Sequence, residues 1–386
     1  MPVITRKIAF YIDSLKLGGA ERVTLQWAQW CAAAGWSVSI ITRQSTTQDV
    51  YTIPVGVNRL VEASPPLIWK TLGWFAFPLR LFRLRKLLKE NRFDACVALT
   101  TLPAVKALLA SRGLGLPCLV SERNYPPAKK PAFAWQVLRR LTYPWANLHF
   151  VQTSQIGSWL KLHCAVKRLY LLPNAVHWPL PSHRPEVFPQ DLIPENAPMI
   201  LAVGTKAHQK GFDRLISIFR SLSLHHPEVY LMIAGIDNQI YKGVDQQKWL
   251  RQLLGSDVSL QKRLIFPGPV GNLSDWYERA SVFVLPSRFE GFPNVLLEAM
   301  ASGCACVASD CLTGPSDLIE NGNNGLLMSP EASELQWEKV LGKLLLDPHR
   351  CAQLGRQAIQ VRNRYSEHHM RHQFLQQLEA CIVNDG

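Results

Sequence analysis

The feature that most constrains the fold of this chain is an alternation of short apolar runs with segments of helical spacing, which occurs twice. The first series has strand-like runs at four places: 7–12, 37–42, 93–99 and 117–121. The second series has five such runs: 199–203, 229–234, 264–267, 282–285 and 305–308. Strands that alternate with helices are typical of a mostly parallel sheet covered by helices on both faces. We therefore predict an α/β chain with two doubly wound, Rossmann-like domains.

A proline-rich stretch separates the two series, with seven prolines between residues 173 and 198. We predict an N-terminal domain at 1–175, a linker at 176–198, a C-terminal domain at 199–365 and a final helix at 366–386 that packs back toward the first domain. In doubly wound sheets, ligands bind beyond the carboxyl ends of the strands. Two such domains in one chain therefore predict a ligand cleft between them.

Positive charge is concentrated in the first half of the chain. Residues 1–175 contain 23 Lys and Arg against 7 Asp and Glu, a net charge of +16. Residues 176–386 contain 19 against 22, a net charge of −3, so the whole excess of +13 belongs to the first half. An excess of this kind on one domain favours an anionic partner.

Aromatic side chains are mixed with Lys and Arg in two segments of that half, 69–92 and 129–145. In the first, Leu81, Leu84 and Leu88 share one face of a predicted helix. Aromatic rings and cations together suit a bilayer interface. We predict contact with an anionic membrane surface, and a solvated basic surface is the alternative. The chain has no helix-turn-helix, zinc-finger or RNA-binding aromatic motif, so we expect no nucleic-acid partner.

No apolar run reaches the roughly 18–20 residues that span a bilayer, and the N-terminal segment lacks the features of a secretory signal. We therefore expect a cytoplasmic protein, peripheral on the inner face of the cell membrane. Nine cysteines without C-x-x-C spacing favour reduced thiols. Three histidines, at 368, 369 and 372, lie in a polar predicted helix whose residues do not complete a metal site, so we expect no metal.

Two glycine- and lysine-containing segments follow predicted strands. Gly18 and Gly19 precede a predicted helix, where they either form a tight turn or allow a ligand to approach the backbone. They do not form G-x-G-x-x-G, which argues against an oxidoreductase. Lys206 and Lys210 flank a loop after the first strand of the second series, where a lysine can meet a diphosphate as a point charge.

The most specific segment is PSRFEGFPNVLLEAMASG at 286–303. A predicted strand runs into a loop that contains Glu290, and the following short helix, 295–301, carries Glu298 in its second turn. The first-turn N–H groups of a helix can hold a phosphate. Glu298 can accept paired hydrogen bonds from a ribose diol, and Glu290 can accept them from a sugar hydroxyl. The alternative, a pair of surface carboxylates, fits poorly because the flanks of the segment are apolar.

This E-x7-E run resembles the GT-B glycosyltransferases of family 4. Four further stretches are similar to that family: GGAERV at 18–23, LPNAV at 172–176, VGTKAHQKGFDRLI at 203–216 and TGPSDLIENGNNGLL at 313–327. The resemblance implies two Rossmann-like domains facing across a cleft, of which 1–175 binds the acceptor and 199–365 binds the nucleotide sugar. It also implies a retaining, metal-independent transfer. It is nearest in character to bacterial enzymes that extend lipid-linked oligosaccharides.

The function implied is transfer of a hexose or N-acetylhexosamine from a nucleotide diphosphate sugar, a UDP-sugar before a GDP-sugar, to a lipid-linked saccharide in cell-surface polysaccharide biosynthesis. The nucleotide sugar is a substrate, so neither a cofactor nor a metal is expected. A phospholipid or a soluble sugar is the alternative acceptor. The alternative of another class is a non-catalytic membrane-binding protein on a degenerate GT-B scaffold.

The resemblance also assigns roles to single residues. Glu298 is implied to hold the ribose, Glu290 the donor sugar and Lys210 the diphosphate, and Gly19 is implied to meet the diphosphate from the first domain. The other implied donor contacts come from loops and the start of the short helix: Gly18, Thr205, Lys206, Pro269, Val270, Gly291, Phe292, Asn294 and Val295.

Two departures from the family pattern affect the site. Thr205 stands where the family usually has arginine, and Lys206 beside it offers a charge without a bidentate fork. The family often has a histidine near the end of an N-domain strand, where this chain has the run 121–126, SERNYP. Glu122 or Arg123 is therefore expected to contact sugar or acceptor phosphate, and the sequence does not choose between them.

Overall fold

The computed structural model describes residues 5–16, 18–62, 77–237, 240–241 and 243–384. The chain forms two compact units, Met1–Asn174 with His368–Gly386, and Ala175–Glu367. We call them the N-terminal and the C-terminal unit and describe each by itself.

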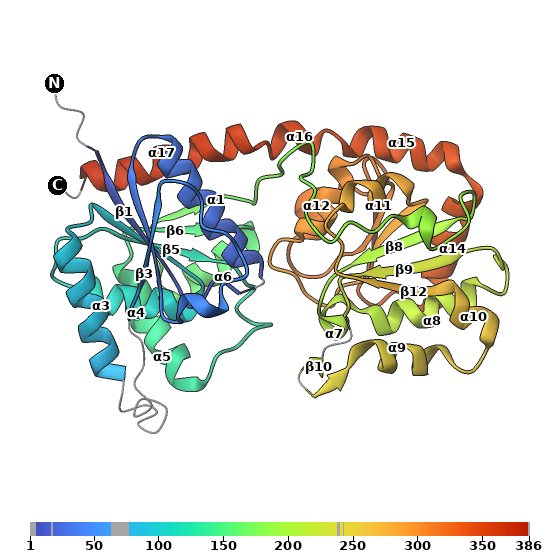
Figure 1. Cartoon of the computed structure of the whole chain (residues 1–386), viewed down its shortest axis with the longest axis horizontal. Helices are drawn as coiled ribbons and strands as arrows, with labels where there is room; N and C mark the ends of the chain where they lie inside the picture. The colour runs from blue at the N-terminus through green and yellow to red at the C-terminus, as the bar shows by residue number, and fades with distance from the viewer. Residues whose placement is uncertain (1–4, 17, 63–76, 238–239, 242, 385–386) are drawn as a thin grey trace. The chain divides into compact units, whose positions relative to one another are not determined.

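A parallel sheet forms the centre of the N-terminal unit (Figure 1), with the strand order β3-β2-β1-β4-β5-β6-β7. Its strands are β1 Lys7–Ile12, β2 Ser37–Thr42, β3 Val57–Val61, β4 Ala95–Leu99, β5 Cys118–Glu122, β6 Leu148–Val151 and β7 Leu169–Leu171. The central strands β1 and β4 are apolar except for the exposed Lys7 at the start of β1, because both faces of the sheet are covered.

The helices of this unit are α1 Gly19–Ala33, α3 Phe77–Asn91, α4 Thr101–Ser111, α5 Phe133–Thr142 and α6 Ser154–Cys164. The last helix of the chain, α17 Glu367–Asn384, also packs on this unit. Its Phe374 is fully buried and stacks on Trp27 of α1, with ring centroids 4.4 Å apart. Helix α17 therefore contributes to the core of the N-terminal unit.

The C-terminal unit has a second parallel sheet, in the order β12-β9-β8-β13-β14-β15. Its strands are β8 Met199–Val203, β9 Tyr230–Ala234, β12 Leu264–Gly268, β13 Val282–Leu285, β14 Cys306–Ser309 and β15 Leu326–Met328, and a separate hairpin pairs β10 Ile240–Tyr241 with β11 Val244–Asp245. Its helices are α7 Ala207–Lys210, α8 Phe212–Leu222, α9 Gln246–Leu254, α10 Val258–Arg263, α11 Leu273–Arg279, α12 Asn294–Ala301, α13 Pro315–Leu318, α14 Glu334–Leu346, α15 Pro348–Ala358 and α16 Val361–Arg364.

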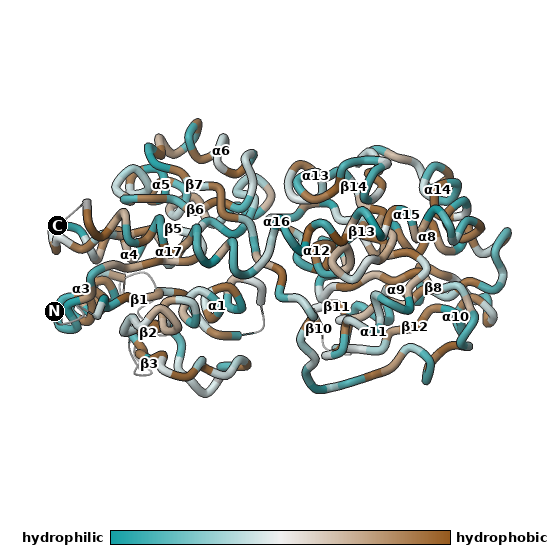
Figure 2. Tube along the Cα trace, turned by 90° about the horizontal axis from the view of Figure 1, so that it is seen from above, coloured by the Kyte–Doolittle hydropathy of each residue, from teal (hydrophilic) through white to brown (hydrophobic). Residues whose placement is uncertain are grey.

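The covering helices are amphipathic. Along α8 and α14 the trace alternates between hydrophobic and hydrophilic segments (Figure 2), as expected where one face of a helix packs on a sheet. In α8 the buried residues include Leu215, Phe219 and Leu222, which recur at helical spacing. The sequence prediction of two doubly wound α/β domains is therefore confirmed.

In each sheet the strand order reverses at one place. In the N-terminal unit this point lies between β1 and β4, and in the C-terminal unit between β8 and β13. The connections that leave the two central strands run in opposite directions there, which opens a crevice at the carboxyl ends of the strands. These two points are where the fold places ligand sites.

Within the described residues, no helix is long and apolar enough to cross a membrane. Part of the first segment predicted to contact a membrane, 69–76, lies outside the described residues.

Candidate functional site

The carboxyl edge of the C-terminal sheet gathers the loops that the sequence singled out. The loop 204–206 follows β8, Pro269 and Val270 follow β12, and the loop 286–293 follows β13. Because all these strands are parallel, the loops share one edge of the sheet. The segments from β8 and β13 flank the point where the strand order reverses.

Lys210 and Glu290 meet at this point. The Lys210 ammonium donates to Glu290 Oε1 at 2.8 Å, and the two side chains are only 15% and 6% exposed. The close approach depends on Gly211, which joins α7 to α8 with a φ of 68°. A Cβ at Gly211 would lie 2.0 Å from the Pro286 carbonyl oxygen at the end of β13. A glycine is therefore required for this turn to reach the strand end.

The Glu290 side chain is held by further contacts from its own loop. The Ser287 hydroxyl donates to the same Oε1 atom at 2.6 Å. The Thr313 hydroxyl, from the segment after β14, donates to the Glu290 backbone carbonyl. A carboxylate with two donors on one oxygen has its orientation set before any ligand arrives.

The loop that carries Thr205 and Lys206 is braced by Gln246 of α9. The Gln246 amide donates to the Thr205 carbonyl at 3.1 Å, and its Oε1 accepts from the Ala207 N–H at 2.8 Å. Gln246 is buried, whereas the Thr205 side chain is exposed. The sequence analysis missed Gln246, because it lies about 40 residues from the loop and belongs to no motif.

Glu298 lies in the second turn of α12, as predicted. Pro293 caps this helix, and its carbonyl accepts from the N–H groups of Leu296 and Leu297 at 3.0 and 3.1 Å. The Tyr277 hydroxyl donates to Glu298 Oε2 at 3.4 Å, which orients the buried carboxylate from α11.

The remaining predicted donor contacts of this unit lie in the same loops. Gly291 and Phe292 lie between Glu290 and the cap of α12, and Asn294 and Val295 are the first two residues of that helix. Pro269 is exposed beyond the end of β12, where the Gly268 carbonyl accepts from the Gly235 N–H at 2.8 Å. Val270 packs on the apolar core of the unit.

Four predicted site residues lie in the N-terminal unit. Gly18 is the extended residue that precedes α1, and Gly19 is the first residue of that helix. The Gly18 carbonyl accepts from the Arg22 N–H at 3.2 Å and from the Tyr51 hydroxyl at 3.3 Å. The glycine loop is thus tied to the segment after β2.

Glu122, at the end of β5, is fully buried. Its Oε2 atom accepts from the Tyr143 hydroxyl at 2.8 Å and from the Thr101 hydroxyl at 3.0 Å. Burial raises the pKa of this carboxyl, opposed by the Tyr143 hydrogen bond and by the nearby positive charge of Arg139. Within the part of the chain that the structure describes, Oε1 has no hydrogen-bond partner.

Arg123 is also buried, and it contacts protein groups on both sides. Its guanidinium donates to the Asn174 side chain and lies 5.5 Å from the centre of the Trp27 ring. Burial lowers the pKa of Arg123 to about 9, partly offset by the negative charge of Glu122. That either residue contacts a ligand stays a prediction from the sequence.

Among the residues that the structure describes, no three His, Cys, Asp or Glu side chains are grouped so that they could hold a metal ion.

Comparisons with known proteins agree with this geometry. The family model described as "Glycosyl transferases group 1" matches residues 183–361, and the one described as "Glycosyl transferase 4-like domain" matches residues 18–175. Together they cover nearly the whole of both units.

One relative is an N-acetyl-D-galactosaminyltransferase of Campylobacter jejuni. It is named as acting on a diphosphoundecaprenol-linked saccharide and is 29% identical over 375 residues, which cover 96% of this chain and 97% of the relative. Two solved structures share the fold. The sucrose-phosphate synthase of Thermosynechococcus elongatus has a TM-score of 0.82 and 20% identity, over 98% of this chain and all of that one. HepE of Anabaena, solved with UDP, has a TM-score of 0.78 and 19% identity, over 97% of this chain and all of that one.

Proposed function

Because the chain is a glycosyltransferase of the GT-B fold and of the family-4 type, we propose that it transfers a hexose or N-acetylhexosamine, with retention and without a metal, from a UDP-sugar to a lipid-linked saccharide. The product belongs to cell-surface polysaccharide biosynthesis. The name of the Campylobacter relative supports the acceptor class, and the UDP complex of HepE supports the nucleotide.

The observation that carries the proposal is the contact between Lys210 and Glu290 at the strand-order reversal of the C-terminal sheet. A diphosphate that arrives there competes with Glu290 for the lysine. Once Lys210 turns to the phosphate oxygens, the Glu290 carboxylate can accept hydrogen bonds from the donor sugar. Ser287 keeps it oriented during this exchange. One ion pair thus supplies both a cation for the leaving group and an acceptor for the sugar.

The chemistry follows from where charge develops. When the bond between sugar and diphosphate breaks, negative charge grows on the diphosphate and positive charge on the sugar ring. Lys210, Lys206 and the start of α12 can stabilise the first, and preorganised charge of this kind often contributes more to catalysis than any other effect. With retention, the acceptor hydroxyl enters on the face that the diphosphate leaves. The departing phosphate oxygen can take its proton, so the reaction needs no protein base.

The lipid-linked acceptor places the enzyme at the inner face of the membrane, and the surface of the N-terminal unit supports this. Phe133, Val137 and Leu141 recur at four-residue spacing on α5, and all three are exposed. The Phe77 ring of α3 meets the Trp135 ring of α5 at 5.5 Å, so the two predicted membrane segments are neighbours.

Exposed Lys129, Lys130 and Arg140 lie beside this apolar stripe and suit an anionic lipid surface. Fewer residues of the segment 129–145 are available to a membrane than the sequence suggested, because Arg139 and Tyr143 are buried inside the unit.

A nucleotide-binding measurement tests the proposal. Thermal unfolding of the purified chain is followed with UDP, GDP, ADP or no nucleotide, for the natural chain and for Lys210→Ala. A ligand at 100 times its Kd adds about 2.7 kcal/mol of stability. We expect stabilisation by UDP that Lys210→Ala strongly reduces. Stabilisation by GDP alone would replace the UDP-sugar with a GDP-sugar, and no stabilisation by any nucleotide would contradict a donor site.

Stereochemistry is tested on the product, and metal dependence is tested on the turnover rate. Proton NMR of the first product formed should give the anomeric coupling of the donor sugar, and the opposite coupling would overturn retention. Turnover should be unchanged by EDTA, whereas a loss that Mg²⁺ or Mn²⁺ restores would overturn metal independence.

A further inference from the structure

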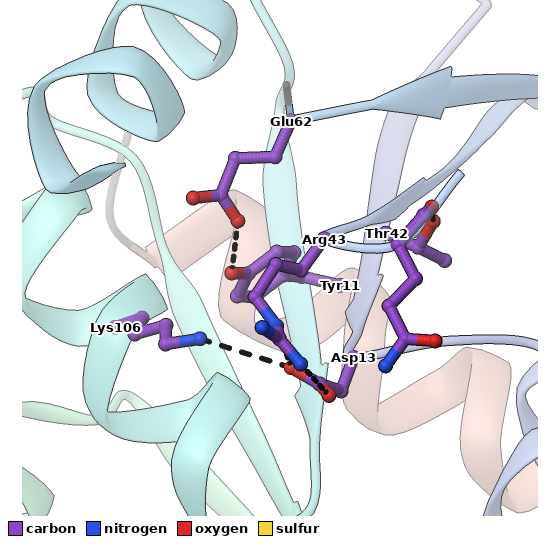
Figure 3. Close-up of polar contacts among 7 residues, drawn as sticks. Tyr11, Asp13, Thr42, Arg43, Glu62 and Lys106 are labelled. Atoms are coloured by element: carbon purple, nitrogen blue, oxygen red, sulfur yellow. Dashed lines mark hydrogen bonds and ion pairs between the residues drawn. The ribbon is translucent and has the colours of Figure 1, made fainter. Parts of the chain in front are cut away.

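The strand-order reversal of the N-terminal sheet carries a second cluster of charged side chains. Asp13 follows β1, Arg43 follows β2, and Lys106 lies on α4, the helix after β4 (Figure 3). Arg43 donates to both carboxylate oxygens of Asp13, at 2.6 and 2.8 Å. Glu62, after β3, accepts from the Tyr11 hydroxyl at 2.6 Å. The cluster therefore lies where doubly wound sheets bind ligands, and the predicted site contains none of its members.

Lys106 is incompletely paired. Its ammonium lies 3.8 Å from Asp13 Oδ1, and no hydrogen bond joins it to the chain over the residues described. Its side chain is only 6% exposed, whereas those of Asp13 and Arg43 are 37% and 35% exposed. Burial lowers the pKa of Lys106, and the negative charge of Asp13 opposes this. The ion pair with Asp13 is longer than a hydrogen bond, so the Lys106 ammonium keeps N–H donors that a ligand at this point can use.

An acceptor atom in the same loop is also unsatisfied. Gln44 follows Arg43, and its backbone N–H donates to the Asp13 carbonyl at 3.1 Å. The side-chain oxygen of Gln44 is buried and has no partner among the described residues. The site thus offers a spare donor, Lys106, and two acceptors, Gln44 and the lone pairs that Arg43 leaves on Asp13.

This mixture favours hydroxyl groups over phosphate. A hydroxyl accepts from an ammonium and donates to a carboxylate or an amide oxygen at the same time. A phosphate oxygen only accepts, and the Asp13 carboxylate repels it. Arg80 also acts electrostatically on this cluster. The cluster then has three positive side chains, of Arg43, Arg80 and Lys106. The carboxylates of Asp13 and Glu62 oppose them. The three cations exceed the two carboxylates by one charge, so the preference for hydroxyl groups rests on the mixture of donors and acceptors and on the Asp13 carboxylate.

We propose that Asp13, Arg43, Gln44 and Lys106 bind hydroxyl groups of the saccharide acceptor. The inference rests on the proposed function, because it identifies the part of the acceptor that the N-terminal unit recognises. Lys106 and Gln44 contact the sugar directly. Arg43 is a positioning residue that fixes the Asp13 carboxylate.

Binding of free sugars to the full chain tests the proposal. Saturation-transfer NMR is recorded with N-acetylgalactosamine, galactose, glucose or mannose, in the presence of saturating UDP, for the natural chain, Lys106→Met and Lys161→Met. Lys161 is an exposed lysine of α6 in the same unit and serves as the control for the loss of one positive charge. We expect Lys106→Met to weaken the binding of at least one sugar about tenfold or more, and Lys161→Met to leave it unchanged.

Glu290→Gln separates the two sugar sites, because free sugars also have access to the donor site. Binding that Lys106→Met removes and Glu290→Gln retains supports the proposal. Binding that only Glu290→Gln removes, or no sugar binding at all, overturns it. Inorganic pyrophosphate is titrated in parallel, and a dependence on Lys106 for pyrophosphate but for no sugar also overturns it.

Asp13→Asn keeps the test decisive where Lys106→Met does not fold. Asp13 is partly exposed, and asparagine preserves its shape while removing the charge, so the same loss of sugar binding is expected. The melting temperature of each variant identifies a folded sample. Lys106-dependent sugar binding in a chain that binds no nucleotide would disprove the proposed donor and keep this inference, so the two failures are distinguishable.

Discussion

Both sheets place a lysine opposite a carboxylate at the point where their strand order reverses, but the two pairs differ in how the charge is shared. In the C-terminal unit Lys210 and Glu290 are in direct contact at 2.8 Å. In the N-terminal unit Arg43 holds Asp13, and Lys106 stays 3.8 Å away. The first arrangement can exchange its partner for a diphosphate. The second offers separate donors and acceptors, which suits neutral hydroxyl groups.

The largest expected effect is on turnover, and it lies on the C-terminal side of this comparison. Under the proposed function, Lys210→Ala removes the cation that stabilises the developing charge of the leaving diphosphate, so kcat should fall by about 10²–10³. It also leaves the buried Glu290 carboxylate with one partner fewer, which lowers stability. The double variant Lys210→Met with Glu290→Gln removes both charges and should recover stability without recovering turnover. Steady-state kinetics and thermal unfolding check the two parts, and unchanged turnover in Lys210→Ala would contradict the role.

Steady-state kinetics of Lys106→Met tests whether the lysines of the two units have different roles. A residue that holds the acceptor should raise the KM for the acceptor and leave the KM for the nucleotide sugar unchanged. A rise in the KM for the nucleotide sugar would mean that both lysines serve the donor, and the contrast between the two units would be wrong.

The second prediction concerns the turn that brings Lys210 to Glu290. Gly211→Ala places a methyl group against the Pro286 carbonyl oxygen and forces a positive φ on alanine. We expect a loss of about 3 kcal/mol or more in the free energy of unfolding, since a displaced backbone is required. Gly113 has a φ of 70°, and a Cβ added there would meet nothing within 4 Å, so Gly113→Ala should cost only about 1 kcal/mol. Denaturant titration measures both, and equal losses would show that close packing is not what distinguishes Gly211.

The sequence predicted the C-terminal site better than the N-terminal one, for a physical reason. Glu290, Gly291 and Glu298 lie close together along the chain, on one loop and the helix that follows, so their spacing alone places them together. The contact between Lys210 and Glu290 could not be predicted, because it joins segments 80 residues apart. Gln246 was missed for the same reason, since a single polar residue far along the chain carries no local signal.

The N-terminal cluster consists entirely of such long-range contacts. Asp13 and Arg43 each follow a predicted strand, but single charged residues at strand ends are common, and 30 residues separate the two. Lys106 lies within an apolar helix, where its burial depends on how α4 packs. Only the sheet order brings the three together.

Strand prediction failed where the local apolar pattern is weak. The strands β1, β2 and β8 were predicted with their observed bounds, since each is a mostly apolar run with five buried residues. The edge strands β3, β7 and β15 were missed, because β3 is interrupted by Asn58 and Arg59 and the other two have only three residues each. The interior strand β6 was missed as well, because it has only four residues and contains His149. Edge strands are covered on fewer sides and need less apolar sequence, so their pattern is weak.

The third prediction concerns the sensitivity of the N-terminal unit to acid. His149 of β6 is buried beside the Tyr143 ring, and burial lowers its pKa to about 3. Between about pH 6.5 and 3 the unfolded chain binds a proton at this position and the folded chain does not, so stability falls as pH falls. At pH 5 this group alone should cost about 2 kcal/mol relative to pH 7. His149→Phe should reduce the slope of stability against pH, measured by denaturant titration. An unchanged slope would mean that the acid sensitivity arises elsewhere.

The smallest expected effect concerns the membrane, which we assign to the N-terminal unit alone. Phe133 on α5 and Leu224 in the C-terminal unit have the same exposed fraction, 79%, so they form a matched pair. Phe133→Ser should weaken binding to vesicles that contain anionic lipid by about tenfold, because it removes roughly 1.5–3 kcal/mol of apolar burial at the interface. Leu224→Ser should leave binding unchanged, since its surroundings belong to the unit without excess positive charge. Co-sedimentation with vesicles of phosphatidylglycerol and phosphatidylethanolamine measures both. Equal losses in the two variants, or none in Phe133→Ser, would remove α5 from the membrane surface and leave the positive charge of the N-terminal unit to be explained by another anionic partner.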